Sequence, residues 1–500
     1  MYLAAKLSRY TSNQIDEIKE TNMNFMDAIP GLKVLDEAGI KKLYFTALEV
    51  LERTGVSVPH QEACKLLKDA GVRVENEVAY IPGWLVEKAV NSAPKQIIIY
   101  SIDGHPVMRL TNGNFYFGTG ENTVFMIDSS TGERRRWTKE DLINAVVLQH
   151  KMEHLDFMTP LGLIQDRPAK VSHLHQFEIM VSYSNKPVMF SAYDAQGVED
   201  IIDMATTIKT SEELEKRPFW MNLMASTSPL IHSGDVLGKL LLSAARKIPI
   251  IYSCSQVAGA TTPVTLAGTI VINLAEGLSA LVISQLKNEG APMIMPGVIM
   301  NMDMKTSVTA YGSPESSLMA CAIAEVYHWL GLTHFGTAGC SDAKVADEQA
   351  AMESCFTCVT QALTGCNVIH DVGYLESGLA GSLDLVVMTN ELLGMIKRFK
   401  QGINLAPECL AADLIDRVGI GNQFLTEDHT LKHFRAENWE PDLFDRYRYD
   451  EWENNGKKDL AQRAQERIEH ILAAPKSKKL DQRQAEELAK IIKNREQNTG

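Results

Sequence analysis

Short apolar runs separated by longer amphipathic segments repeat along the chain from about residue 138 to about residue 450. The short runs have almost no polar positions, whereas the segments between them show the three-to-four-residue apolar spacing of helices. Nearly continuous apolar strands separated by helices are typical of a parallel sheet that is buried on both faces. Seven such strands can be counted, with an eighth possible near the ends of the region. The pattern therefore favours an α/β fold of the (β/α)8 TIM-barrel type over an open, doubly wound sheet. The runs are FMTPLG, KPVMFSAY, PFWMNLMAS, IPIIYSCSQ, APMIMPGVIM, THFGTAGC and NVIHDVGYLE.

Three regions outside the predicted barrel have different patterns. Residues 1–95 have periodic apolar positions, which predict an N-terminal helical region. Residues 96–137 alternate short apolar runs with Asp-Gly, Asn-Gly and Thr-Gly turn signals, so we predict a small antiparallel sheet. Residues 451–500 are densely charged and helical in pattern, which predicts surface helices or an arm on a neighbouring subunit. The catalytic barrel is accordingly predicted at 138–450.

Composition excludes several classes of function. The chain is 45% hydrophobic and 22% charged, as in ordinary soluble proteins, and has no charge-free apolar run of membrane-spanning length. The N-terminus lacks the apolar core of a signal peptide, so a cytoplasmic protein is expected. A net charge of -14 argues against nucleic acid, whose phosphates require a basic surface. Cys355 and Cys358 form a CxxC motif inside a helical pattern without a second pair nearby, which indicates reduced, packed thiols.

Aromatic residues are frequent at the predicted strand ends, although only 7% of the whole chain is aromatic. In a TIM barrel the functional side chains lie at the C-terminal ends of the strands. Several rings at one mouth would bind a quaternary ammonium group by cation–π attraction, worth about 0.5–2 kcal/mol per ring. Imidazole or amide groups would bind a carboxylate elsewhere in such a substrate. For any single ring, core packing is the alternative. The candidate substrate-binding residues are Tyr116, Phe117, Glu121, Phe190, Tyr193, Asn222, Tyr252, Gln256, His334, Phe335 and Tyr374.

A catalytic metal is only weakly indicated. Hydrolytic barrels use an HxH motif on a strand together with later His and Asp ligands. The only HxH motif here, His173 and His175, lies in a helical pattern. We therefore predict no metal site. A metal-dependent hydrolase or lyase built around His334, His370 and Asp342 stays open as the alternative.

Two long segments stand out near the end of the predicted barrel: residues 336–353, GTAGCSDAKVADEQAAME, and residues 367–378, NVIHDVGYLESG. They resemble the signatures of the trimethylamine methyltransferase superfamily. Residues 118–123, GTGENT, and 128–135, DSSTGERR, also fit, and the similarity covers the chain from about residue 30 to 450. The resemblance implies a TIM barrel that transfers a methyl group from a methylamine to the Co(I) corrinoid of a small partner protein. It implies no permanently bound cofactor.

One departure from the family pattern narrows the expected substrate. The founding archaeal members carry pyrrolysine near the segment equivalent to GTAGCSDAK, whereas this chain has only standard residues there. Members without pyrrolysine resemble demethylases of quaternary amines such as glycine betaine, proline betaine or carnitine. We therefore expect a methyltransferase of this type, acting with a cognate corrinoid protein and forming a homo-oligomer. A non-catalytic betaine-binding protein is a further alternative.

The run at 367–378 supplies the candidate catalytic residues. We expect a strand that ends with His370 facing the substrate, where its imidazole would donate to a substrate carboxylate. Asp371 would orient His370 or a neighbouring loop, Tyr374 would add a ring, and Glu376 would face the cation or support its neighbours. The alternative is that Asp371 and Glu376 only cap the following helix.

Overall fold

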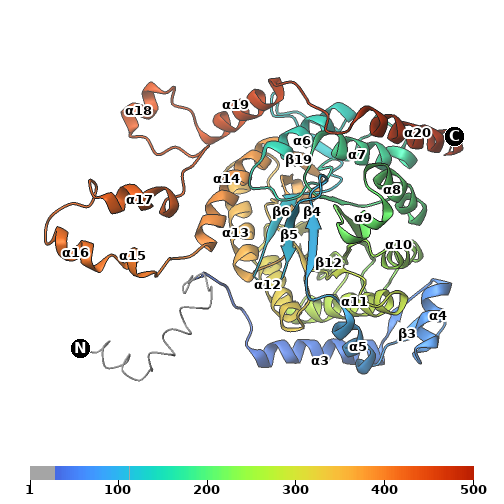
Figure 1. Cartoon of the computed structure of the whole chain (residues 1–500). Helices are drawn as coiled ribbons and strands as arrows, with labels where there is room; N and C mark the ends of the chain where they lie inside the picture. Colours follow the sequence, from blue (N-terminus) through green and yellow to red (C-terminus); the bar gives the residue numbers. More distant parts are fainter. Residues whose placement is uncertain (1–28, 112, 500) are drawn as a thin grey trace. The chain divides into compact units, whose positions relative to one another are not determined.

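Eight parallel strand segments close into a barrel in the computed structural model, which describes residues 29–111 and 113–499 (Figure 1). One sheet has the order β13-β11-β10-β9 and another the order β16-β17-β6, and single bridges join their edges. The second barrel strand is the short segment of residues 157–158, which lies between β6 and β9. On one side Met158 forms a bridge with Val188 of β9, and on the other the Asp156 N–H donates to the Phe117 carbonyl of β6 at 2.7 Å. The predicted (β/α)8 barrel is therefore confirmed. The other strands are β6 (Tyr116–Thr119), β9 (Val188–Phe190), β10 (Trp220–Ala225), β11 (Ile250–Ser253), β13 (Met293–Ile294), β16 (Phe335–Thr337) and β17 (Val368–Val372).

Helices between the strands form the outer layer of the barrel (Figure 1). Their starts follow from the local sequence, because Asp194, Ser233 and Asp347 each accept a backbone N–H of the first helical turn. Gly365 ends one of them in a left-handed conformation with φ +82°, which glycine adopts without steric cost. The helices are α6 (Lys139–Lys151), α7 (Ala169–Tyr183), α8 (Ala195–Ile208), α9 (Ser211–Lys216), α10 (Gly234–Ala245), α11 (Leu266–Lys287), α12 (Pro314–Trp329), α13 (Glu348–Thr364) and α14 (Leu383–Lys400).

The N-terminal end of the barrel is closed by a hairpin of β4 (Ile97–Tyr100) and β5 (Pro106–Leu110). Ile97, Ile99, Met108 and Leu110 of this hairpin share one apolar cluster with the interior side chains of the barrel strands. The Tyr100 N–H donates to the carbonyl of Pro218, just before β10 begins, at 2.8 Å. Access to the barrel interior is thereby left to the C-terminal end.

The region 96–137 differs from the single antiparallel sheet predicted there. The hairpin β4–β5 is antiparallel, as is the pair β7 (Phe125–Ile127) and β8 (Arg134–Arg136). Between them, however, β6 pairs in parallel with β17 and is the first strand of the barrel. The turn signals on both sides of β6 concealed this, because they are the same signals that mark hairpins.

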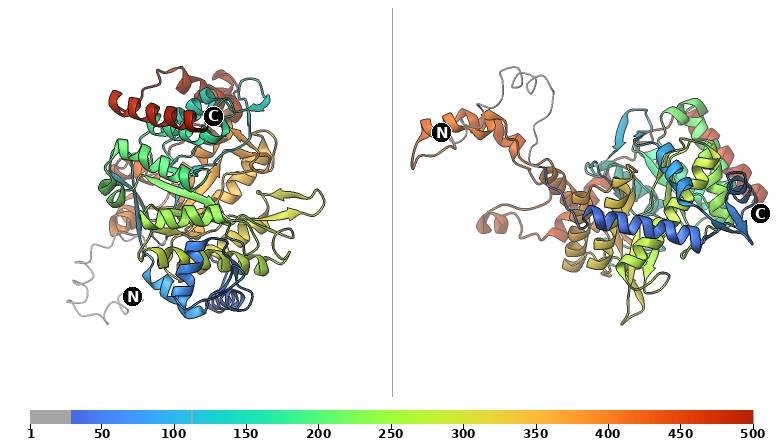
Figure 2. Two further views of the ribbon diagram at one scale, coloured as in Figure 1. Left: turned by 90° about the vertical axis from the view of Figure 1, so that its right-hand side faces the viewer. Right: turned by 90° about the horizontal axis from the view of Figure 1, so that it is seen from below.

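Smaller β elements extend the C-terminal end of the barrel. β18 (Tyr374–Leu375) pairs antiparallel with β19 (Ala380–Ser382), which in turn lies beside β7. β12 (Gln256–Ala258) pairs with β14 (Ile299–Asp303), and β14 forms a hairpin with β15 (Val308–Ala310). This hairpin projects from the barrel, drawn in yellow at the right of the left-hand view in Figure 2.

The N-terminal region contains the predicted helices together with a small sheet. The helices are α3 (Glu37–Arg53), α4 (Gln61–Asp69) and α5 (Gly83–Ser92). The strands β1 (Val56–Ser57), β2 (Arg73–Glu75) and β3 (Val78–Tyr80) pair in the order β1-β3-β2. The part of the helical prediction that falls on residues 1–28 lies outside the described residues.

The helix α11 is long and apolar enough to cross a membrane, the only one of this kind among the described residues. However, 72% of its most apolar window is buried in the protein, where α11 packs against α3, α5, α10 and α12. It is therefore a core helix of the barrel unit.

By contacts, the described residues divide into a barrel unit, which comprises 31–396 and the residues from Pro441 onward, and a second unit that includes Lys397–Glu440. In the first unit, α19 (Leu460–Ala473) packs on α6, and α20 (Gln482–Thr499) packs on α7 and α8. The predicted C-terminal helices thus contact the barrel of their own chain. The other helices within the described residues are α15 (Pro407–Leu410), α16 (Ala412–Val418), α17 (Asp428–Glu437), α18 (Tyr449–Asn454) and a 3₁₀ turn, η1 (Glu376–Gly378).

Candidate functional site

A β-bulge near the end of β17 brings His370 and Asp371 together. The register of β17 against β6 shifts here, so that His370 and Asp371 both stand opposite Gly118. Neighbouring side chains of a regular strand point to opposite faces, but a bulge re-aims one of them. Asp371 takes φ +83°, and its Oδ1 lies 2.7 Å from His370 Nδ1. The Thr337 hydroxyl, at the end of β16, donates to the other oxygen of Asp371.

Three polar atoms of this pair have no hydrogen-bond partner among the described residues. They are Nδ1 and Nε2 of His370 and Oδ1 of Asp371, whose mutual contact is not aligned as a hydrogen bond. Buried polar atoms are nearly always hydrogen-bonded, so such a group at a strand end is suited to a ligand. His173 and His334 also have unpaired ring nitrogens, but their rings lie in the helix layer.

His370 lies on the apolar floor of the interior. Its imidazole stacks on the ring of Phe335, with centroids 4.3 Å apart and planes 22° apart. Phe335 belongs to the interior apolar cluster, and the side chain of His370 is 10% exposed. Because the hairpin β4–β5 closes the opposite end, this exposure indicates that His370 is reached from the C-terminal mouth.

Two tyrosines stand beside Asp371. The Tyr374 hydroxyl accepts the Glu121 N–H at 2.7 Å and donates to the Glu121 carbonyl at 2.5 Å. Its ring covers Gly120 so closely that a Cβ there would lie 1.8 Å from the ring. Tyr311 meets Tyr374 edge to face, with centroids 6.4 Å apart. Burial, and next the Asp371 carboxylate, raise the pKa of both tyrosines. Tyr311 was missed by sequence reasoning because it lies in the loop after β15, away from any barrel strand.

A second carboxylate, Glu121, lies next to this group. Its Oε1 accepts the Ser191 N–H at 2.7 Å, at the end of β9. Burial raises the pKa of Glu121 to about 8; the Ser191 N–H and Lys239 oppose the rise and the Asp371 charge adds to it. The mouth therefore combines two carboxylates, one imidazole and two phenol rings, an inventory suited to an organic cation.

Asp342 fixes the loop that carries Tyr311. Its carboxylate accepts the backbone N–H groups of Tyr311 and Gly312 at 2.9 and 3.0 Å, and the Ser377 hydroxyl at 2.8 Å. The three loops that follow β15, β16 and β17 are thus joined through one side chain. Asp342 is occupied as a backbone acceptor, which does not suit the role of metal ligand considered for it.

Several predicted aromatic residues face the helices instead of the mouth. Phe190 packs on Phe177 at 5.9 Å between ring centroids, and the Tyr252 hydroxyl contacts His232 Nδ1 at 2.5 Å. Phe117 lies in the cluster that includes α6 and α14. In strands that are apolar on both faces, the sequence does not mark which alternate positions point inward.

The two predicted amide residues and His334 also point outward. The Asn222 side-chain amide donates to the Ser243 hydroxyl at 2.9 Å. Gln256 donates to Glu276 on α11 at 2.7 Å. His334 is fully buried and stacks on Tyr327 of α12 at 6.4 Å. These side chains link strands to the helix layer and are not brought to the mouth.

The three other predicted residues lie at separate places. Tyr116 points into the barrel near its closed end, where its hydroxyl accepts the Arg109 N–H at 2.9 Å. Tyr193 is exposed on the loop after β9. Glu376 forms a two-bond ion pair with Arg134, at 2.7 and 3.0 Å, which ties β8 to the loop after β17.

Among residues 29–111 and 113–499, no group of three His, Cys, Asp or Glu side chains is arranged to hold a metal ion. His175 of the HxH motif bonds Glu496 at 3.0 Å on α20. Cys355 and Cys358 are free thiols on α13, and burial raises the pKa of both. The ligand set considered for a hydrolase or lyase is dispersed, because His334 faces α12 and Asp342 holds a loop.

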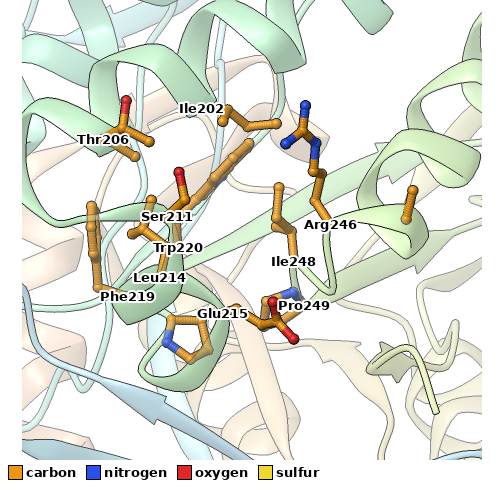
Figure 3. Close-up of a pocket in the computed structure, with 13 residues that line it drawn as sticks. Ile202, Thr206, Ser211, Leu214, Glu215, Phe219, Trp220, Arg246, Ile248 and Pro249 are labelled. Atoms are coloured by element: carbon orange, nitrogen blue, oxygen red, sulfur yellow. The ribbon is translucent and has the colours of Figure 1, made fainter. Parts of the chain in front are cut away.

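A surface pocket of about 280 Å³ lies far from this mouth (Figure 3). It is bounded by α8, α9 and the end of α10, and by the residues that lead into β10 and β11. Phe219, Trp220 and Ile248 form its apolar wall, with Glu215 and Arg246 at its edge (Figure 3). The N-terminal ends of the strands, where it lies, carry stability more often than chemistry in this fold.

Known proteins resemble the chain over most of its length. A family model described as "Trimethylamine methyltransferase (MTTB)" matches residues 5–500. The chain is 31% identical over 430 residues to trimethylamine methyltransferase MttB of Desulfitobacterium hafniense, covering 85% of this chain and 86% of that protein. It is 30% identical over 475 residues to the glycine betaine methyltransferase of Desulfitobacterium hafniense strain Y51, covering 94% and 93%. Among solved structures, the monomethylamine methyltransferase MtmB of Methanosarcina barkeri aligns with a TM-score of 0.46 at 11% identity, covering 91% and 97%.

Proposed function

The chain belongs to the trimethylamine methyltransferase family, and from this premise we propose that it transfers a methyl group from a quaternary amine to the Co(I) corrinoid of a partner protein. The expected donors are betaines of the glycine betaine, proline betaine or carnitine type. The observation that carries this proposal is the unpaired polar edge of His370 and Asp371, lying beside the rings of Tyr311 and Tyr374. The relative named for glycine betaine, which aligns over 94% of the chain, supports the same substrate class.

The cationic end of the substrate requires charge and π faces. A quaternary ammonium group has no N–H to donate, so ordinary hydrogen-bond acceptors cannot fix it by direct bonds. Aromatic rings attract it by about 0.5–2 kcal/mol each, and a nearby carboxylate adds Coulombic attraction. Tyr311, Tyr374, Asp371 and Glu121 supply these groups at one end of the barrel.

The carboxylate end of a betaine requires a donor. Nε2 of His370 has no partner within the described residues and can donate to the substrate carboxylate, while Asp371 lies on the Nδ1 side of the ring. The stacked ring of Phe335 holds the imidazole plane in place from below. The substrate would then lie with its carboxylate at His370 and its methyl groups toward the open mouth.

The partner's Co(I) corrinoid supplies the nucleophile, and the methyl group leaves while both electrons of the broken N–C bond stay on the tertiary amine. A positively charged nitrogen needs no proton to become a leaving group. The residues of this chain therefore bind, orient and dehydrate the cation. The corrinoid is a substrate brought by the partner, and the proposal includes no permanently bound cofactor.

The test is the spectral conversion of Co(I) cobalamin to methyl-Co(III) with the purified protein. Each quaternary amine is compared with trimethylamine and with a reaction that lacks amine. Conversion with at least one betaine supports the proposal, and an Asp371→Asn variant, which keeps the shape but loses the charge, should be much slower. Binding of a betaine without conversion would indicate a binding protein, and stoichiometric zinc or iron in the purified protein would favour a hydrolase or lyase.

We also propose that the enzyme works in the cytoplasm. All eight cysteines are free thiols, and five of them are buried. Unpaired cysteines are typical of a reducing compartment, where disulfides are rare.

A further inference from the structure

The hairpin β14–β15 and the short strand β12 form a three-stranded sheet beside the mouth of the barrel (Figure 2). β12 lies in the connection between β11 and α11 and pairs in parallel with β14. At the other edge of the sheet, β15 leads directly into Tyr311 and contacts η1, in the loop after β17. The whole sheet belongs to the barrel unit. It therefore forms a part of the rim that is continuous with the candidate site.

The tip of this hairpin has a defined conformation. The Asp303 carboxylate accepts the backbone N–H groups of Lys305 and Thr306 at 2.7 and 3.4 Å. The Asp303 carbonyl accepts the Ser307 N–H at 2.8 Å. An Asp side chain that bonds the backbone two residues on is a common way to fix a turn. The tip thus holds its outer side chains in place before any partner arrives.

Two large apolar side chains meet at this tip and are exposed. Met304 is 69% exposed, and Val264, in the connection after β11, is 65% exposed. Both lie over Gly259, where an added Cβ would stand 3.4 Å from Met304 Sδ and 3.5 Å from Val264. No other described element of the barrel unit covers them. We call Met304, Val264 and Gly259 the rim patch.

The loops around the rim patch are uncharged. Residues 226–233 and 254–265 are the complete connections after β10 and β11, and they contain no Asp, Glu, Lys or Arg. Across the whole chain 22% of the residues are charged. Charged side chains are depleted, and methionine is enriched, in the cores of protein–protein interfaces. This side of the rim is therefore suited to contact another protein.

The size of the rim patch indicates which kind of protein fits it. Obligate homodimers bury about 2,000–5,000 Å² of mainly apolar surface, whereas transient encounters bury less than about 1,200 Å². A patch with two large apolar side chains suits the transient class. A protein that delivers Co(I) and leaves with a methyl group must dissociate after each transfer, so its complex is transient.

The depth of the site shows where such a protein has to rest. The side chains of His370 and Asp371 are only 10% and 1% exposed, so a cofactor has to enter the mouth to reach a substrate beside them. The protein that carries the cofactor then remains on the rim. We propose that the rim patch is the surface on which the corrinoid partner docks, through an apolar face next to its cofactor. This inference rests on the proposed function.

The test compares two methyl acceptors in the cobalt assay. Free Co(I) cobalamin needs no docking surface, whereas the second acceptor is a purified corrinoid protein that the wild type methylates. Met304→Asp combined with Val264→Asp places two carboxylates in the rim patch, and both side chains are exposed enough that little packing within the chain is lost. Met304→Leu combined with Val264→Ile keeps the patch apolar. Val107→Asp, at an exposed position of β5 at the closed end of the barrel, is the matched control for added charge.

The charged double variant should raise KM for the corrinoid protein at least about tenfold and keep the rate with free cobalamin within about twofold, because unpaired charges would be buried only in the docked complex. The apolar double variant and Val107→Asp should keep the wild-type KM. If the charged double variant has an unchanged KM for the corrinoid protein, the inference is wrong and the proposed function stands. A wild type that methylates neither acceptor overturns both.

Hydrogen exchange provides a second measurement that does not use catalysis. Amides of 302–310 should exchange more slowly when the corrinoid protein is added, whereas those of 106–110 should be unaffected. A rim patch already covered by a second copy, or by other residues of its own chain, would show no such slowing. That result overturns the proposal.

Discussion

Replacing Glu121 with Gln tests how the mouth binds a cation. Burial raises the pKa of Glu121 to about 8 from a usual 4.5. At that value about one side chain in ten is ionised at pH 7 and about nine in ten at pH 9. A quaternary ammonium group cannot titrate, so any change of its affinity with pH belongs to the protein. If the ionised carboxylate faces the cation, the dissociation constant should fall about tenfold from pH 7 to pH 9, or about 1.4 kcal/mol.

Other titratable groups around Glu121 could also make the affinity depend on pH. Asp371 and Tyr374 face it from the loop region of β17, and Lys239 faces it from α10. Burial lowers the pKa of Lys239, whose loss of charge at high pH would also favour a cation. The Glu121→Gln variant separates the effect of Glu121 on the affinity from that of Lys239, because it removes only the carboxylate.

Titration calorimetry with glycine betaine at constant ionic strength provides the measurement. The Glu121→Gln variant should bind more weakly than the wild type does at pH 7, and its affinity should not change from pH 7 to pH 9. The matched control is Glu276→Gln, since burial raises the pKa of Glu276 to about 7 but its carboxylate bonds Ser228 and Gln256 in the helix layer. The control should keep the wild-type pH dependence of affinity. A wild-type affinity that is flat from pH 7 to 9, or a Glu121→Gln variant with the full tenfold change, would refute the reasoning.

Three further predictions concern single side chains. His370→Ala should raise KM for the amine about tenfold to a hundredfold with less effect on kcat, because a charge-assisted hydrogen bond of about 1.5–3 kcal/mol is lost; an unchanged KM in the cobalt assay would remove His370 from the site. Gly120→Ala places a methyl group 1.8 Å from the Tyr374 ring, so urea denaturation should show a loss of about 1–3 kcal/mol in unfolding free energy, with slower turnover. At Gly31 a new Cβ would lie 3.9 Å from its nearest neighbour, so Gly31→Ala should change neither the unfolding free energy nor the turnover. Equal effects of the two substitutions would contradict the close packing of the Tyr374 ring on Gly120. Glu276 has a folded pKa raised to about 7, so its contribution to stability is full below about 4.5 and lost as pH rises through 7; Glu276→Gln should flatten the stability profile in that window, and an unaltered profile would count against this origin.

The sequence was sufficient to predict the barrel fold, because the apolar spacing of helices and the continuous apolar runs of buried strands are distinct patterns. It was also sufficient to select His370, Asp371 and Tyr374 as a group, since strand ends of a barrel meet at one mouth. The position of Asp371 opposite Gly118 depends on a bulge, which alternation along the strand does not reveal.

The other side chains of the mouth could be predicted only in part. Tyr252 and Phe190 were chosen for residue type, but inward and outward positions are both apolar in a strand that is buried on two faces. Tyr311 reaches the mouth from a loop that Asp342 fixes through backbone N–H groups, a long-range contact that has no local pattern. The sequence did not predict β6 as a barrel strand, because hairpin-type turn signals flank it on both sides. Its partner β17 is also the last strand of the barrel, far away in the sequence.

That pairing of the first barrel strand with the last affects how the protein is made. Val368 pairs with Tyr116, so roughly 250 residues must be translated before β6 meets its partner. At about 5–20 residues per second, the ribosome needs on the order of 10–50 s for that stretch. During this time one edge of β6 has open backbone groups that another nascent chain can join. The yield of native enzyme should therefore depend on chaperone supply and on the speed of translation between these two strands.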